Sequence, residues 1–163
     1  MIGIDKKGKI VQEYYLEFNT DAYKYGNDLS ITLIPDTEFN ISTTGNSKLR
    51  VIFSASTVLS LPPNFTSAAR FNITLSIDET FNKTARVSYF SNYALPDIIQ
   101  ISYTISIILE SETLSKGLHN VKVFWNSIYD SGNSVFLIMY NANFRYPRSL
   151  LIEEIGTANL FGL

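Results

Sequence analysis

A single histidine and scattered carboxylates are the side chains of this sequence that could perform acid–base chemistry. His119 could serve as a general base or a metal ligand, but no Gly-x-Ser-x-Gly elbow accompanies it. At the start of a predicted strand, it is expected to bond a neighbouring backbone group instead. The chain has no cysteine, which removes thiolate nucleophiles and cysteine metal sites. We expect no catalytic, cofactor-binding or metal-binding residues, and no enzyme activity.

Carboxylates in pairs could support hydrolysis or bind calcium. Glu153 and Glu154 are adjacent in a predicted strand, so their side chains should point to opposite faces and form no pair. Asp78, Glu79 and Asp130 fall in predicted turns whose spacing does not match an EF-hand loop. The alternatives are a calcium site built from distant loops, or a glycan hydrolase with two carboxylates converging on one cleft.

Modification chemistry is suggested by four Asn-x-Ser/Thr sequons clustered between residues 40 and 84. Their number is close to the chance expectation for a chain rich in Asn, Ser and Thr, although the clustering favours occupancy. Two lie in predicted loops, Asn64 and Asn82, and Asn72 lies in a strand on the face opposite Phe71 and Ile73. The candidate N-glycosylation sites are Asn40, Asn64, Asn72 and Asn82.

Exposed aromatic side chains could bind a sugar, since aromatic faces stack on sugar rings. Tyr23 and Tyr25, in a predicted loop over 19–28, could form such a surface together with Tyr14 and Tyr15, or they could fill a core or a subunit interface. Trp125 continues the apolar face of the strand that contains it and is expected in the core.

The carboxyl-terminal segment 156–163 ends in apolar side chains that could contact another subunit. An exposed apolar tail is a liability in a monomer, so the tail either folds back on its own domain or docks on a neighbour. The residues concerned are Leu160, Phe161 and Leu163.

Composition limits the class of protein that must position these residues. A chain of 163 residues is large enough for one core, and its net charge of −2 gives no electrostatic drive toward nucleic acid. The most apolar run, 98–109, is too short for a helix to cross a hydrocarbon layer of about 30 Å, and the amino terminus lacks a signal-peptide pattern. We expect no nucleic-acid partner and no membrane span.

Alternating apolar and polar residues predict strands along the whole chain, separated by Gly, Pro, Asn and Asp turns. Only the segment Glu110–Lys116 could form a helical turn. We predict an all-β, single antiparallel β-sandwich of about 8–10 strands over 1–163, with 1–8 and 156–163 as candidate extended arms. The predicted strands are 9–18, 29–34, 38–43, 49–59, 69–77, 84–90, 98–109, 119–126, 135–144 and 148–155.

The last quarter of the chain resembles the closing strands of compact jelly-roll domains of the C1q and tumour-necrosis-factor type, and of structural proteins of viruses and phages. This resemblance implies jelly-roll topology and an often trimeric module for binding or assembly. The matching residues are Gly117, His119, Val121, Val123, Trp125, Gly132, Arg148, Ser149, Leu150, Ile152 and Glu153.

Two functional hypotheses follow. The first is a non-enzymatic structural protein at a virion surface, such as a capsid, turret or spike subunit, potentially of an archaeal virus. Such a subunit would form a homo-oligomer, a trimer or pentamer, with other virion proteins as partners. Three features favour this hypothesis: an uncharged polar composition, candidate glycans and the missing secretory pattern. The alternative is an extracellular carbohydrate- or receptor-binding module of C1q-like or lectin-like type, using Tyr23, Tyr25 and acidic turn residues.

Overall fold

The computed structural model describes residues 9–18, 20–139 and 148–156, and within these ranges every regular element is a β-strand. The all-β prediction is confirmed. The strands are β1 (Ile10–Phe18), β2 (Ala22–Tyr25), β3 (Thr32–Thr43), β4 (Ser47–Leu61), β5 (Ala68–Ile77), β6 (Phe81–Phe90), β7 (Ile99–Glu110), β8 (Gly117–Ser127), β9 (Phe136–Met139) and β10 (Arg148–Gly156).

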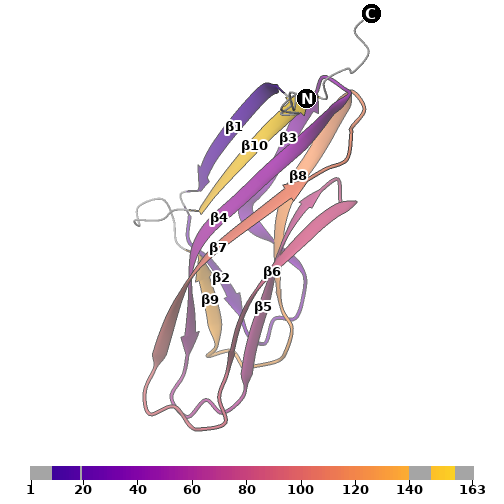
Figure 1. Ribbon diagram of the computed structural model, residues 1–163. Helices are drawn as coiled ribbons and strands as arrows, with labels where there is room; N and C mark the ends of the chain where they lie inside the picture. The colour runs from indigo at the N-terminus through magenta and orange to yellow at the C-terminus, as the bar shows by residue number, and fades with distance from the viewer. Residues whose placement is uncertain (1–8, 19, 140–147, 157–163) are drawn as a thin grey trace, which may run out of the picture.

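The strands form two antiparallel sheets that face each other (Figure 1). In the first, called the β4 sheet, the long strand β4 pairs with β7 along one side and with β10 and then β9 along the other. Strands β1 and β2 extend this sheet beyond β10 and β9 respectively. The second, called the β8 sheet, has the order β3-β8-β5-β6.

The path of the chain between the sheets is that of a jelly roll. Strand β1 lies beside β10, which is the last strand, and β3, β4, β5 and then β7 and β8 alternate between the sheets. Such long crossovers are the Greek-key connections of this architecture. The fold implied by the closing strands is therefore confirmed.

Alternation along each strand builds the core between the sheets. The inward residues of β4 and β5 are buried, while their outward neighbours are half-buried over most of each strand and buried near its carboxyl-terminal end. Trp125 is 3% exposed and continues the buried face of Val121 and Val123, as predicted. Sheets packed about 10 Å apart share such inward side chains as a single hydrophobic layer.

Three local predictions are corrected. The predicted loop 19–28 contains strand β2, whose inward position is occupied by a buried lysine, Lys24, that reads as polar in the sequence. The two strands predicted around Pro35 are one strand, β3, because an edge strand tolerates proline at a bulge and the register shifts there, with Asp36 at φ 65°. The predicted helical turn Glu110–Lys116 is instead the end of β7 followed by an extended connector, in which Leu114 bridges to Ser47.

Other predictions fall where no description is given. The second half of the predicted strand 135–144, the arm 1–8 and the tail residues Leu160, Phe161 and Leu163 lie outside the described residues.

Candidate functional site

The outer face of the β4 sheet carries a row of apolar side chains that crosses four strands. The cross-strand register aligns Ile108 of β7, Ile52 of β4, Leu151 of β10 and Tyr15 of β1. Ile108 is 48% exposed and Tyr15 is 59% exposed, while the two central residues are half-buried. This alignment comes from pairing between distant strands, so the sequence alone did not show it.

A second apolar group lies further along the same face, on β9 and β2. Tyr23 pairs with Ile138 and Tyr25 pairs with Phe136, and the Tyr25 and Phe136 ring centroids are 6.2 Å apart. Both tyrosines are about half exposed, at 50% and 49%. They therefore lie on one face of an edge strand, and not in the loop that the sequence predicted. Tyr14 points away from Tyr15, with its ring 5.2 Å from that of Phe39.

Small hydroxyl side chains separate the two apolar groups. In the register, Ser54 lies between Ser106 and Ser149, and Ser56 lies opposite Thr104. These side chains add little bulk and no charge, and the row through Ser54 ends on β1 at the exposed carboxylate of Glu17. Val58 and Ile138 point to this side but are buried, at 9% and 8% exposed, so the tyrosines supply the exposed apolar surface there. We call the whole surface the β4 outer face; it comprises Tyr15, Glu17, Tyr23, Tyr25, Ile52, Ser54, Ser56, Val58, Thr104, Ser106, Ile108, Phe136, Ile138, Ser149 and Leu151.

One end of this face is charged. Arg50 Nε donates to Glu110 Oε1 at 2.6 Å, and its Nη1 lies 3.5 Å from Glu153 Oε2. Glu13 lies opposite Glu153 in the register. The hydrogen bond to Glu110, and the two carboxylates, raise the pKa of Arg50, and this ion-paired row bounds the apolar surface.

The opposite face of the sandwich, the outer face of the β8 sheet, is mostly polar, with exposed apolar side chains at Leu118 and Phe90 near the strand ends. Lys122 pairs with Glu79 at 3.3 Å and Glu38 at 3.5 Å, and Thr74 and Thr84 hydroxyls are 2.8 Å apart. The two outer faces of the sandwich therefore differ in chemistry.

Three of the four sequon asparagines lie on this polar face. Asn40 Oδ1 accepts from Asn120 Nδ2 at 2.8 Å, and Asn72 Oδ1 accepts from Arg86 Nε at 3.1 Å. Asn82, which the sequence placed in a loop, is the second residue of β6. Asn64 lies in the β4–β5 connection with φ 61°. The sequons remain candidate sites.

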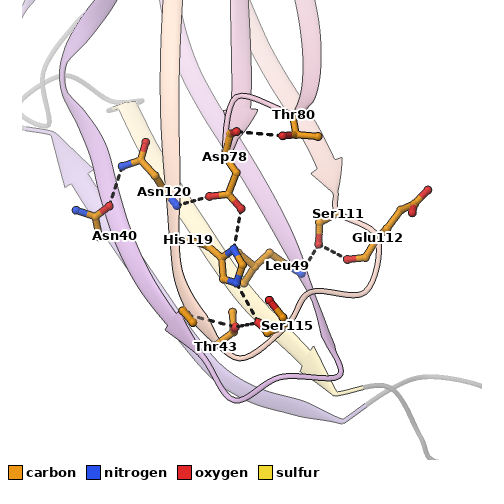
Figure 2. Close-up of polar contacts among 11 residues, drawn as sticks. Asn40, Thr43, Leu49, Asp78, Thr80, Ser111, Glu112, Ser115, His119 and Asn120 are labelled. Atoms are coloured by element: carbon orange, nitrogen blue, oxygen red, sulfur yellow. Dashed lines mark hydrogen bonds and ion pairs between the residues drawn. The ribbon is translucent and has the colours of Figure 1, made fainter.

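His119 lies 9% exposed at the end of the sandwich where β8 begins (Figure 2). Its Nδ1 is 2.7 Å from Asp78 Oδ2, and its Nε2 is 3.1 Å from the carbonyl oxygen of Ser115. The expected backbone contact is confirmed, but the carboxylate partner was missed because Asp78 is 41 residues away. Burial lowers the pKa of His119, yet the hydrogen bonds to Asp78 and Ser115 outweigh it, so the pKa is raised.

The adjacent glutamates point to opposite faces, as predicted. Glu153 lies on the β4 outer face, whereas Glu154 is 0% exposed and accepts hydrogen bonds from Gln12 Nε2, Thr44 N, Thr44 Oγ1 and Ser47 Oγ at 2.6–2.8 Å. Burial raises the pKa of Glu154, but these donors outweigh burial and the pKa is lowered. Its role is to hold the β3–β4 turn.

Two buried cations were missed because lysine and arginine are usually exposed. Lys24 is 2% exposed and its Nζ donates to Asp28 Oδ2 at 2.6 Å, to the Ser30 carbonyl and to Thr32 Oγ1. The hydrogen bond from Lys24, and others from Ser30, lower the pKa of Asp28 to about 2. Arg148 is 0% exposed, donates to the carbonyls of Thr20 and Pro35, and packs 5.5 Å from the Phe18 ring centroid.

Metal binding has no support in the described ranges, where no three His, Asp or Glu side chains gather closely enough to hold an ion. The turn carboxylates have local partners: Asp78 Oδ1 accepts from Asn120 N at 2.7 Å, and Asp130 Oδ1 accepts from Gly132 N at 3.1 Å. In the part of the chain that the structure describes, no helix has the length and apolar character to cross a membrane.

Comparison with known proteins gives a likeness of fold alone. No family model and no curated protein matches the sequence. Latent PorU from Porphyromonas gingivalis matches with 10% identity and TM-score 0.43, over 94% of this chain and 14% of that one. A chain of infectious bursal disease virus, Gt strain, matches with 8% identity and TM-score 0.38, over 98% and 41%. The globular domain of zebrafish complement 1qA matches with 10% identity and TM-score 0.27, over 88% and 95%. The chain thus spans less than half the length of the PorU chain and of the infectious bursal disease virus chain that it matches.

Proposed function

We propose that this protein is a non-enzymatic structural subunit that assembles with further copies of itself through the β4 outer face, as a capsid, turret or spike component of a virion surface. The observation that carries the proposal is the apolar row of Tyr15, Leu151, Ile52 and Ile108 across four strands. Contiguous exposed apolar surface of this kind marks an interaction site.

The size of the face supports a subunit contact. Four strand positions about 4.8 Å apart, along a strand of 15 residues rising about 3.3 Å each, span roughly 700–1,000 Å². A stable interface needs about 800 Å² from each partner. The serine and threonine side chains between the apolar groups allow a second surface to approach closely. The carboxylate in their row, Glu17, lies on the outermost strand β1, where it can remain at the rim of the contact.

The polar outer face of the β8 sheet supports an orientation of the subunit in which the β4 sheet faces the neighbouring copy. Asn40, Asn72 and Asn82 lie on the outer face of the β8 sheet, so glycans there would point away from a contact through the β4 sheet. A glycan joins Nδ2, and the Oδ1 atoms of Asn40 and Asn72 keep their hydrogen bonds from Asn120 and Arg86. A subunit with its sequons outward is suited to the outside of a particle.

The test uses the absence of cysteine to attach a polymer at one chosen serine. Ser106→Cys lies on the exposed outer side of β7 in the β4 sheet, and the control Ser88→Cys lies on the exposed outer side of β6 in the β8 sheet. After coupling to a polyethylene-glycol maleimide, each variant is measured by light scattering. We expect a trimer or pentamer for the unmodified chain and for coupled Ser88→Cys, and a monomer for coupled Ser106→Cys.

Either of two results would overturn the proposal. The first is a wild-type chain that stays monomeric at high concentration. The second is a coupled Ser106→Cys variant that assembles as well as the coupled control.

A second candidate function, carbohydrate binding, is favoured by the pair Tyr23 and Tyr25. Two tyrosines on one side of a strand lie about 6.6 Å apart, and Phe136 adds a third ring beside Tyr25. The pair could stack on consecutive sugar rings in an extracellular module. A glycan array should then show selective binding that Tyr23→Ala and Tyr25→Ala abolish and Tyr93→Ala, in the β6–β7 connection, leaves intact. Because the pair is part of the β4 outer face, a monomer that binds glycans would favour this candidate over assembly.

A further inference from the structure

The His119 ring lies between two hydrogen-bond acceptors. A backbone carbonyl such as that of Ser115 can only accept, and an ionised carboxylate such as that of Asp78 can only accept. Both ring nitrogens must therefore carry a proton for both contacts, at 2.7 Å and 3.1 Å, to be hydrogen bonds. Either neutral tautomer would leave a nitrogen lone pair directed at an oxygen. The geometry selects the doubly protonated, positively charged ring.

The two contacts join separate pieces of the chain. Asp78 belongs to the β5–β6 turn, and Ser115 belongs to the connector 111–116 between β7 and β8 (Figure 2). The Ser115 carbonyl also accepts from Thr43 Oγ1 at 2.9 Å, and the connector bonds to the start of β4 through Leu114 N and the Ser47 carbonyl at 2.7 Å. His119 therefore links the β5–β6 turn to the segment on which the β3–β4 turn packs.

The turn that provides Asp78 is held in an uncommon conformation. Asp78 and Glu79 have φ values of 51° and 58°, in the left-handed region that costs L-residues about 1 kcal/mol or more each. The Asp78 carboxylate secures this turn through His119 and through Asn120 N at 2.7 Å. Loss of the contact to His119 removes one of the two bonds that the Asp78 side chain makes to β8.

The charges that bear on the ring favour its protonated form. Asp78 acts from the β5–β6 turn and Glu154 acts from β10, and both are negative. Lys122 and Glu38 are on the outer side of their strands, where Lys122 pairs with Glu38 and Glu79. Glu112 and Lys116 of the connector are exposed to solvent.

We propose that His119 is a pH-operated clasp, in which the doubly protonated ring holds the β5–β6 turn and the connector 111–116 together, and loss of one proton releases the connector. This inference is independent of the proposed assembly function. The released state lacks one of the two ring contacts, so the connector and the adjoining β3–β4 turn open more often.

In the closed state the connector is bonded to the protonated His119 ring, and in the open state it is not. Protonation of the ring and closure of the connector therefore favour each other, which sets the sign of the pH dependence. The pKa of His119 is raised in the closed state, so closure is fully favoured below the ordinary histidine pKa of about 6.5 and is lost as the pH rises through the raised value. Between these two values, the ratio of closed to open connector falls as the pH rises, by at most about tenfold for each pH unit.

The only histidine of the chain makes the test direct, because its ring signals need no assignment. Nitrogen-15 NMR titration of the full chain should show both ring nitrogens protonated at pH 6.5 and a pKa above the ordinary value. The protection factor of Leu114 N against hydrogen exchange, which removes the intrinsic pH effect, should fall as the pH rises across the same titration, by at most about tenfold per unit. Trp125, 3% exposed, reports by fluorescence whether each sample is folded.

Variants separate the clasp from a merely structural contact. Asp78→Asn should lower the His119 pKa and flatten the protection profile, and His119→Gln should give a flat profile. The control Asp130→Asn, in another turn, should leave the pKa and the profile unchanged. A wild-type ring that is neutral at pH 6.5, or a Leu114 protection factor that does not follow the His119 titration, would overturn the proposal even if the variants failed to fold.

Discussion

The buried carboxylate of Glu154 allows a sharp test of how the end of the sandwich is held, because an adjacent glutamate provides the control. In the folded chain, Glu154 accepts four hydrogen bonds and is 0% exposed. Glu153 lies on the outer face, 3.5 Å from Arg50. The perturbation is Glu154→Ala compared with Glu153→Ala, with Glu154→Gln as the variant that keeps the shape.

The expected cost of Glu154→Ala comes from donors left without an acceptor. Thr44 is exposed, so water can satisfy its N–H and hydroxyl, but Ser47 is 0% exposed and its hydroxyl loses a buried acceptor; an unsatisfied buried donor costs about 1–3 kcal/mol. The variant also loses hydrogen bonds to a charged acceptor. Together, these two effects should lower the free energy of unfolding by about 2–4 kcal/mol. Glu154→Gln should cost about 1–2 kcal/mol, since its oxygen can keep three of the contacts. Glu153→Ala should cost under about 1 kcal/mol, because Arg50 stays paired with Glu110.

Guanidinium denaturation followed by the fluorescence of Trp125, the only tryptophan, measures these differences. A loss of 2–4 kcal/mol corresponds to a melting temperature lower by roughly 5–15 °C in a chain of this length. Equal stability of the Glu154→Ala and Glu153→Ala variants would refute the reasoning. So would a Glu154→Gln variant more stable than wild type.

The pH dependence adds an independent check on Glu154. Its pKa is lowered in the folded state, so its stabilising effect is fully present above the ordinary glutamate pKa of about 4.3. The effect is lost as the pH falls through the folded-state value. Glu154→Gln should therefore lose less stability than wild type on acidification below pH about 4.3, whereas Glu153→Gln should follow wild type.

Two further predictions concern a buried cation and the turn glycines. Lys24→Met keeps the length of the side chain but removes three hydrogen bonds. We expect the free energy of unfolding to fall by about 1–3 kcal/mol and the pKa of Asp28 to rise from about 2. An unchanged carbon-13 titration of Asp28 would contradict its pairing with Lys24. Gly45→Ala should be costlier than Gly132→Ala, because both have φ near +90° but only at Gly45 would a Cβ lie 2.9 Å from Lys116 N. Gly132→Ala should cost about 1 kcal/mol, and equal unfolding free energies for the two variants would show that the contact with the connector is absent.

The period-two alternation of the sequence predicted the strands and the inward faces, because burial on one side of a sheet demands it. That is why Trp125 and the opposite orientations of Glu153 and Glu154 were predicted correctly. It could not predict β2, where the inward residue is Lys24 and the pattern reads as polar. A lysine becomes an inward residue only when three acceptors surround it, and the sequence does not reveal that surrounding.

The β4 outer face could not be predicted for a different reason. In the run 98–109, apolar residues occupy both faces at its carboxyl-terminal end, so Ile108 cannot be told from its inward neighbours without the register. Ile52 and Leu151 are likewise embedded in apolar strands. Only the pairing of β7, β4, β10 and β1 shows that the outward members form one row, and the same holds for His119 and Asp78, which approach across 41 residues.

Three buried charges of the described residues lie where strands are connected, and each bonds a described connection of a sandwich that has no cysteine. Lys24 bonds the β2–β3 connection, Arg148 bonds carbonyls at Thr20 and Pro35, and Glu154 bonds the β3–β4 turn. Apolar side chains could fill the same space, but dispersion and hydrophobic burial have no direction and would accept several loop geometries. A buried charge favours the arrangement that gives it partners, since an unpaired one is strongly destabilising, although Arg148 Nε has no hydrogen-bond partner. Replacing one of these charges should therefore loosen a specific connection while the strand register, set by the hydrophobic layer, stays unchanged. The β4 outer face would then persist in a variant with a loosened end, which makes assembly and loop order separately measurable properties of the same molecule.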